Sequence, residues 1–169
     1  MTIASIGGSS SQKGTITIER TYHARIEEVW ALWTTKDGIE SWWGPDGFTV
    51  TVHSIDLRPG GELRYGMTAT ATPQIEFMKK AGMPLSTEHR VVYTAVVPSS
   101  RLAFTHLVDF VPGIEPYNVS ILVELHEAPN GVRIVLTVDR MHDDVWTQRA
   151  VAGWESELRK LEKVLKAKE

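Results

Sequence analysis

The side chains that could carry out acid–base chemistry are few, and they fall on predicted strands and one short helix. His106 alternates with Phe104 along an apolar segment, so its imidazole is expected to face the protein interior. An imidazole there could orient a ligand hydroxyl or act as an acid or base, but a lone histidine on an apolar strand face is more often an ordinary core residue. The other acid–base candidates are Tyr65, Tyr93 and Glu76.

Motifs for metal binding and nucleophilic catalysis are not found in the sequence. The six histidines show no paired spacing such as HExxH, and the chain has no cysteine. There is no GxSxG nucleophile turn and no glycine-rich phosphate loop. We therefore expect no metal, no cofactor and no dedicated catalytic residue. Any catalysis would depend on acid and base groups held in a pocket.

Length and composition predict one soluble globular domain. The chain has 169 residues, of which 42% are hydrophobic and 23% charged. The net charge is −3 and the basic residues are scattered, which argues against nucleic acid as a partner. The apolar runs are too short for a membrane span, and the absence of cysteine fits a cytoplasmic protein. We interpret residues 1–14 as a flexible tail and residues 15–169 as the domain.

Period-two alternation of apolar residues predicts one strand near the N-terminus and a meander of six more. Asn130-Gly131 predicts a tight hairpin turn, because both central positions of such a turn favour positive φ. The predicted strands are Thr15–His23, a strand from Phe48 to the turn at 58–61, Glu62–Thr70, Thr87–Val97, Arg101–Phe110, Tyr117–Glu127 and Val132–Val138.

Apolar spacings of three and four residues predict helices at three places. The segment 24–43 contains two short helices that end before Gly44-Pro45, and Asp143–Lys166 is a long amphipathic helix. The segment 71–86 carries a short apolar-faced helix between prolines, which we interpret as an insertion over the sheet and a lid. Helices gathered on one side of an antiparallel sheet define the α+β class. A long sheet curls, and a single helix on its concave face leaves a gap suited to a ligand.

The aromatic and apolar candidates for this gap have simpler structural explanations as well. Trp42 and Trp43 could rim the cavity or seal the short helix against the sheet, and the methionines could be pocket wall or core filler. Gly153 lies within the long helix, where glycine costs about 1 kcal/mol relative to alanine, so either a strand or a ligand is expected beside it. Trp154 is expected to be buried. The predicted cavity residues are Trp42, Trp43, Tyr65, Met67, Phe77, Met78, Phe104, His106, Val119, Ile121, Gly153 and Trp154.

Three motifs in fixed order resemble a known family. They resemble the family named for the C-terminal domain of the activator of the heat-shock-protein-ninety ATPase. The motifs are RTYHARIEEVWALWTTKDGIESWWGPDGF, then DLRPGG, then Gly153-Trp154 followed by LRKLEKVL. The resemblance covers residues 15–166. It implies a helix-grip fold of the START-like, birch-pollen-allergen-like superfamily, with a curved sheet around a C-terminal helix and a hydrophobic cavity. Members bind or transport lipids, hormones and polyketides or, less often, transform them.

Three functions follow as hypotheses. The leading one is binding of a hydrophobic small molecule; the second is a cofactor-free polyketide cyclase or aromatase; the third is a chaperone-partner domain. True activators resemble one another in having an additional N-terminal domain. Fewer than fifteen residues precede the first strand here, so we expect the chaperone function of the family to apply less readily to this chain. The segment 71–86 also departs from the shortest family members. The sequence does not fix the oligomeric state, and a homodimer is compatible with it.

Overall fold

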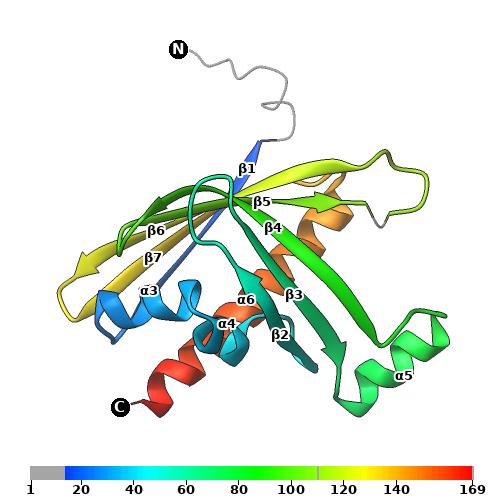
Figure 1. Ribbon diagram of the computed structural model, residues 1–169, viewed down its shortest axis with the longest axis horizontal. Helices are drawn as coiled ribbons and strands as arrows, with labels where there is room; N and C mark the ends of the chain where they lie inside the picture. The colour runs from blue at the N-terminus through cyan, green and yellow to red at the C-terminus, as the bar shows by residue number, and fades with distance from the viewer. Residues whose placement is uncertain (1–13, 110, 169) are drawn as a thin grey trace.

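A seven-stranded antiparallel sheet curves around helices that lie on its concave side (Figure 1). The computed structural model describes residues 14–109 and 111–168, so the predicted tail, apart from Gly14, lies outside the described residues. The elements are β1 Thr15–Tyr22, α3 Ile26–Thr34, α4 Lys36–Trp42, β2 Phe48–Ile55, β3 Glu62–Ala69, α5 Thr72–Lys80, β4 Ser86–Val97, β5 Arg101–Val108, β6 Tyr117–Ala128, β7 Gly131–Asp139 and α6 Asp144–Ala167.

The strand order is β1-β7-β6-β5-β4-β3-β2, with β1 and β2 at the two edges. Every neighbouring pair is antiparallel, and α3 and α4 connect one edge strand to the other. Apolar residues alternate along each strand and bury one face, as the period-two pattern predicted. The architecture confirms the predicted α+β helix-grip fold with two short helices after the first strand.

Helix α6 lies across the concave face, with one apolar side toward the sheet (Figure 1). Its N-terminus is capped by Asp143, whose side chain accepts a hydrogen bond from the Trp146 amide at 2.8 Å. The buried positions are Thr147, Leu158, Leu161 and Leu165. Within the described ranges, no helix has both the length and the apolar character needed to cross a membrane.

Helix α5 stands at the end of the β3–β4 hairpin, well away from α6 (Figure 1). It is attached to the segment before β2, because the Gly47 carbonyl accepts hydrogen bonds from the Thr70 and Ala71 amides at 2.8 and 3.1 Å. Met78 is buried there, whereas Phe77 is 65% exposed. The helix predicted within 71–86 is present, and its role as a lid stays a prediction.

The β6–β7 turn differs from the predicted one. Ala128 pairs with Gly131, so the two loop residues are Pro129 and Asn130, and neither Asn130 nor Gly131 has positive φ. The proline ring fixes φ near −65°, which excludes a turn with positive φ at both centres. Gly131 is required for another reason: a Cβ there would collide with the backbone carbonyl oxygen of Tyr22.

This close approach makes Gly131 a test of the packing between β1 and the β6–β7 turn. We expect Gly131→Ala to lower the free energy of unfolding by about 1 to 3 kcal/mol, because the added methyl group has no space without a backbone shift. Asn130→Ala in the same exposed turn is the control, expected within about 0.5 kcal/mol of the parent. Urea denaturation measures both, and an unchanged Gly131→Ala midpoint would contradict the close approach.

Candidate functional site

An aromatic cluster joins α3, α4 and α6 to the concave face of the sheet. Trp43 directly follows α4 and lies at the centre of the cluster. Its ring centroid is 5.6 Å from Trp33, 5.2 Å from Trp42, 6.1 Å from Trp154, 6.2 Å from Tyr65 and 5.9 Å from Phe104. Most contacts are edge-to-face, the geometry that aromatic rings prefer. The cluster closes the part of the fold beneath α3 and α4.

The structure brings most of the predicted cavity residues to one region. Cross-strand pairing places His106 opposite Val119 and Phe104 opposite Ile121, all on the inner face. A Cβ at Gly44 would lie 3.9 Å from the Met67 Cε atom, so Met67 belongs to the same region. Of the predicted cavity residues, one hydrophobic core contains Trp42, Trp43, Tyr65, Phe104, Val119 and Ile121, with Met67 and Trp154 packed against it.

Two predicted residues lie elsewhere, and Trp42 fills the contact between α3 and α4. Trp42 is fully buried between α3 and α4, where its indole donates a hydrogen bond to the Leu32 carbonyl at 2.7 Å. That position matches the interpretation in which this tryptophan seals the short helix. Phe77 and Met78 lie on α5, apart from the aromatic cluster. Of the other acid–base candidates, Glu76 is exposed on α5, and Tyr93 is buried with no hydrogen-bond partner among the described residues.

The flank of α6 that faces the α4–β2 segment contains open space. A Cβ built on Gly153 meets no atom within 4 Å, so no strand packs against this position. Trp154 stacks on Trp33 with centroids 6.1 Å apart and planes 19° from parallel. It is nevertheless only partly buried, where the sequence predicted burial. The open flank explains this difference, because the neighbouring position 153 contributes no side chain to cover the ring.

Glu157 lies one turn after Gly153 and was not singled out from the sequence. Its Oε1 atom accepts a hydrogen bond from the Gly44 amide at 3.0 Å. Lys160 donates to the carbonyl of the same Gly44 at 2.9 Å, so two side chains of α6 hold one residue of the α4–β2 segment. Its position around the helix could have indicated this residue. Residue 157 is four positions from Gly153 and three from Trp154, which places its carboxyl at the margin of the apolar stripe.

Burial perturbs the acid–base properties of Glu157 and Tyr65. Desolvation raises the pKa of Glu157 from 4.5 to about 7, against smaller opposing effects of the Gly44 amide and the Lys160 charge. Desolvation also raises the pKa of Tyr65 to about 12, and the nearby Glu157 charge adds to this rise. At neutral pH the site therefore contains a carboxyl group that titrates and a phenol that keeps its proton.

Two histidines extend this polar group across the sheet. The His89 ring stacks on Tyr65 at 5.3 Å, and its Nε2 atom shares a 2.7 Å hydrogen bond with the Thr87 hydroxyl. Burial lowers the pKa of His106, and the neighbouring His89 lowers it further. Burial likewise lowers the pKa of His89. Neutral imidazoles on the inner face are groups that can move a proton or orient a ligand hydroxyl.

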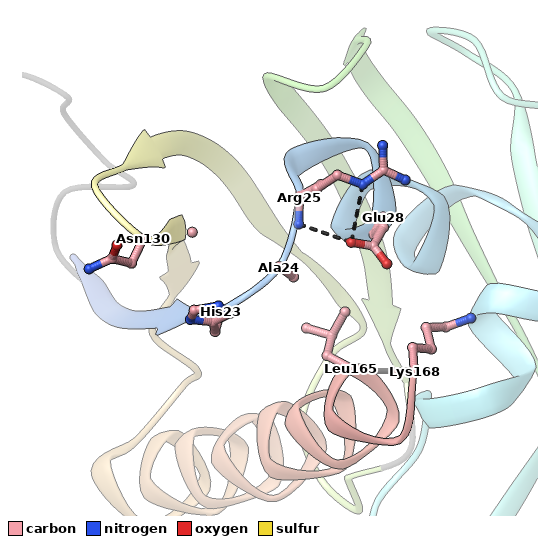
Figure 2. A pocket seen from close by; sticks show the side chains of 8 residues that line it. His23, Ala24, Arg25, Glu28, Asn130, Leu165 and Lys168 are labelled. Atoms are coloured by element: carbon pink, nitrogen blue, oxygen red, sulfur yellow. Dashed lines mark hydrogen bonds and ion pairs between the residues drawn. The ribbon is translucent and has the colours of Figure 1, made fainter.

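Two pockets among the described residues open at the margins of the fold, and neither is lined by a predicted cavity residue. One, of about 350 Å³, lies between the end of β1, the β6–β7 turn and the end of α6, where Glu28 accepts a hydrogen bond from the Arg25 amide (Figure 2). The other, of about 780 Å³, lies beside the start of α6. It is lined by Ile16, Arg140, Met141, His142, Asp143, Asp144, Thr147, Gln148, Val151, Ala152 and Glu155.

The raised pKa of Glu157 makes the stability of the protein depend on pH. Between about pH 4.5 and 7 the folded protein keeps the proton of Glu157, whereas the unfolded chain releases it. The contribution of Glu157 to the free energy of unfolding is therefore complete below about pH 4.5 and is lost as pH rises through about 7. Glu157→Gln removes the effect. We expect the difference in free energy of unfolding, variant minus parent, to rise by up to about 3 kcal/mol when the pH is raised from 4.5 to 8.

Urea denaturation across this pH range measures the gain. The matched control is Glu155→Gln, which removes a carboxylate from the opposite flank of α6, where Glu155 pairs with Arg20 at 3.4 Å. An equal gain in both variants would assign the effect to overall charge and contradict the burial of Glu157.

The family model for activator of Hsp90 ATPase homolog 1-like proteins matches residues 23–166. No curated protein sequence matches the chain. The fold is similar to a solved structure from Chromobacterium violaceum at 21% identity and a TM-score of 0.73, covering 90% of this chain and 96% of that one. It is also similar to the AHSA1 protein from Silicibacter pomeroyi, at 22% identity and 0.70, covering 92% and 99%. A third similar structure is the AHSA1-like protein from Aeromonas hydrophila, with 23% sequence identity and a TM-score of 0.70. That match covers 90% of this chain and 92% of the other.

At these identities the solved structures support the fold alone. The family model covers most of the chain and includes the motifs around the aromatic cluster, the Arg58–Gly61 turn and Gly153-Trp154. The chain therefore belongs to the activator of Hsp90 ATPase homolog 1-like family of helix-grip proteins.

Proposed function

We propose that this chain binds a hydrophobic small molecule, such as a lipid, polyketide or aromatic metabolite, between the concave face of the sheet and α6. The observation that carries the proposal is the open space beside Gly153. Three apolar residues of the same helix, Trp146, Ala150 and Trp154, are only partly buried against the core. A ligand in this space would remove apolar surface from water, which gains about 25 cal/mol for each Å² covered.

A second feature supports an apolar ligand with some polar character. The inner face is mainly apolar, yet Tyr65 and His106 place polar groups on it. Small-molecule sites in proteins typically combine apolar walls with a few placed polar groups. The polar groups would fix the orientation of the ligand, and the tryptophan rings would supply contact area.

Binding of the environment-sensitive dye 8-anilinonaphthalene-1-sulfonate tests the proposal. We expect saturable one-to-one binding, with displacement by fatty acids or aromatic polycycles. Gly153→Leu should fill the open space and weaken dye binding about tenfold, equivalent to about 1.4 kcal/mol. Gly153→Ala should keep binding and raise stability by up to about 1 kcal/mol, because its methyl group meets nothing within 4 Å.

The matched control is Ala152→Leu, which adds the same bulk about 100° around the helix, toward the outer pocket beside the start of α6. Thermal melts establish that each variant is folded. Absence of saturable binding to the parent protein would refute the proposal. An equal loss in Ala152→Leu and Gly153→Leu would move the site to the outer pocket.

Cofactor-free acid–base catalysis is the second candidate. It is favoured by a series of neighbouring groups, in which Glu157 acts on Tyr65, Tyr65 stacks on His89, and His89 acts on His106. A titrating carboxyl and a protonated phenol could abstract and return a proton next to a carbonyl group, as a cyclase requires. Deuterium exchange at the central carbon of an apolar 1,3-diketone, followed by nuclear magnetic resonance, tests this. We expect acceleration by the parent and at least a tenfold loss in Glu157→Gln, whereas equal rates would contradict catalysis.

A further inference from the structure

We propose that the second carboxyl oxygen of Glu157 selects the ligand: the site takes an apolar molecule that carries a hydrogen-bond donor, a hydroxyl or protonated amine, at one end. This inference rests on the proposed function, because it concerns the same space between α6 and the sheet. It adds the chemical class of the group that the ligand presents to α6.

The hydrogen bonds of Glu157 leave one oxygen for a ligand. Oε1 is held by the Gly44 amide, which fixes the rotation of the side chain, and Oε2 has no hydrogen bond to a described residue. Lys160 donates its bond to the Gly44 carbonyl instead of to Glu157. Glu157 is partly buried. A carboxylate has about four lone-pair sites on its two oxygens, so one with a single protein partner has acceptor capacity left for a ligand or for water.

The position of Glu157 brings this oxygen to the ligand space. Residues 153 and 157 are four apart and therefore lie on one flank of α6, one turn from each other. The open space at Gly153 thus adjoins the carboxyl group. Tyr65 lies close enough for the Glu157 charge to raise its pKa, and Trp43 is in contact with Tyr65. An apolar body in the open space beside Gly153, against the partly exposed face of Trp154, would place its polar end at Glu157.

The carboxylate of Glu157 itself favours a donor over an acid, although the ammonium group of Lys160 acts in the opposite direction. Several charged or titratable groups surround Glu157. Those that face it are Lys160 on α6, Tyr65 on β3, and Asp46, which acts on Lys160 from the α4–β2 segment. A ligand carboxylate would bring a second negative charge against Glu157, at a cost that low-dielectric surroundings increase. A hydroxyl or ammonium group would instead form a charge-assisted hydrogen bond, which is stronger than a neutral one.

Competition between three ligands that share one alkyl chain and differ in the polar end group tests the inference. Decylamine, 1-decanol and decanoate, each below its micelle concentration, displace 8-anilinonaphthalene-1-sulfonate from the parent, Glu157→Gln and Glu155→Gln at pH 6 and 8. For the parent at pH 8 we expect decylamine and decanol to bind more tightly than decanoate. Glu157→Gln should weaken decylamine at least tenfold and leave decanoate unchanged or tighter. Parent affinity for decylamine should rise between pH 6 and 8, as Glu157 loses its proton.

At pH 8, where Glu157 is mostly ionised, Glu155→Gln changes the net charge by nearly the same amount. It therefore separates the local carboxyl from general attraction between an amine and an acidic protein. It should behave as the parent does. Equal weakening of decylamine in both variants, or a preference of the parent for decanoate that Glu157→Gln does not alter, would overturn the inference. Either result with intact dye binding leaves the proposed function standing, whereas loss of dye binding by the parent itself refutes the proposed function.

Discussion

The attachment of α6 to Gly44 fixes how the helix lies against the sheet. A helix that contacts a sheet only through apolar side chains can rotate or slide with little change in buried area, because the hydrophobic effect is non-directional. Glu157 and Lys160 remove this freedom by bonding the amide and the carbonyl of one residue. The preceding residue, Trp43, packs against Trp154 on the same helix, so the hydrogen bonds and the aromatic packing enforce one rotation.

This fixed rotation gives α6 two unlike halves. Toward its C-terminus, Leu158, Leu161 and Leu165 are buried and leave the helix closely packed. Toward its N-terminus, Gly153 faces open space and Trp154 is partly exposed. A glycine within a helix lowers stability, so its place beside the exposed ring needs a compensating reason. Room for a ligand is such a reason, and it agrees with the apolar inner face of the strands opposite.

The sequence predicted the elements far better than the side-chain environment of the site. Alternation along the strands and the stripe on α6 are local patterns, and they located all seven strands and the helices. Turn geometry failed at Asn130-Gly131, because the requirement for glycine came from the Tyr22 carbonyl of a distant strand. Glu157 escaped notice for the same reason: its burial depends on Gly44, which is 113 positions away. Contacts of this kind leave no periodic signal.

A glutamate at position 157 is not needed to hold Gly44. Glutamine could accept the same hydrogen bond from the amide without the cost of burying a charge, and that cost reduces stability above neutral pH. Residues that lower stability without a structural gain tend to be those that function requires. What a carboxyl offers and an amide does not is a negative charge and a proton-accepting oxygen. The space beside Gly153, which we propose as the ligand site, is where those two properties can act.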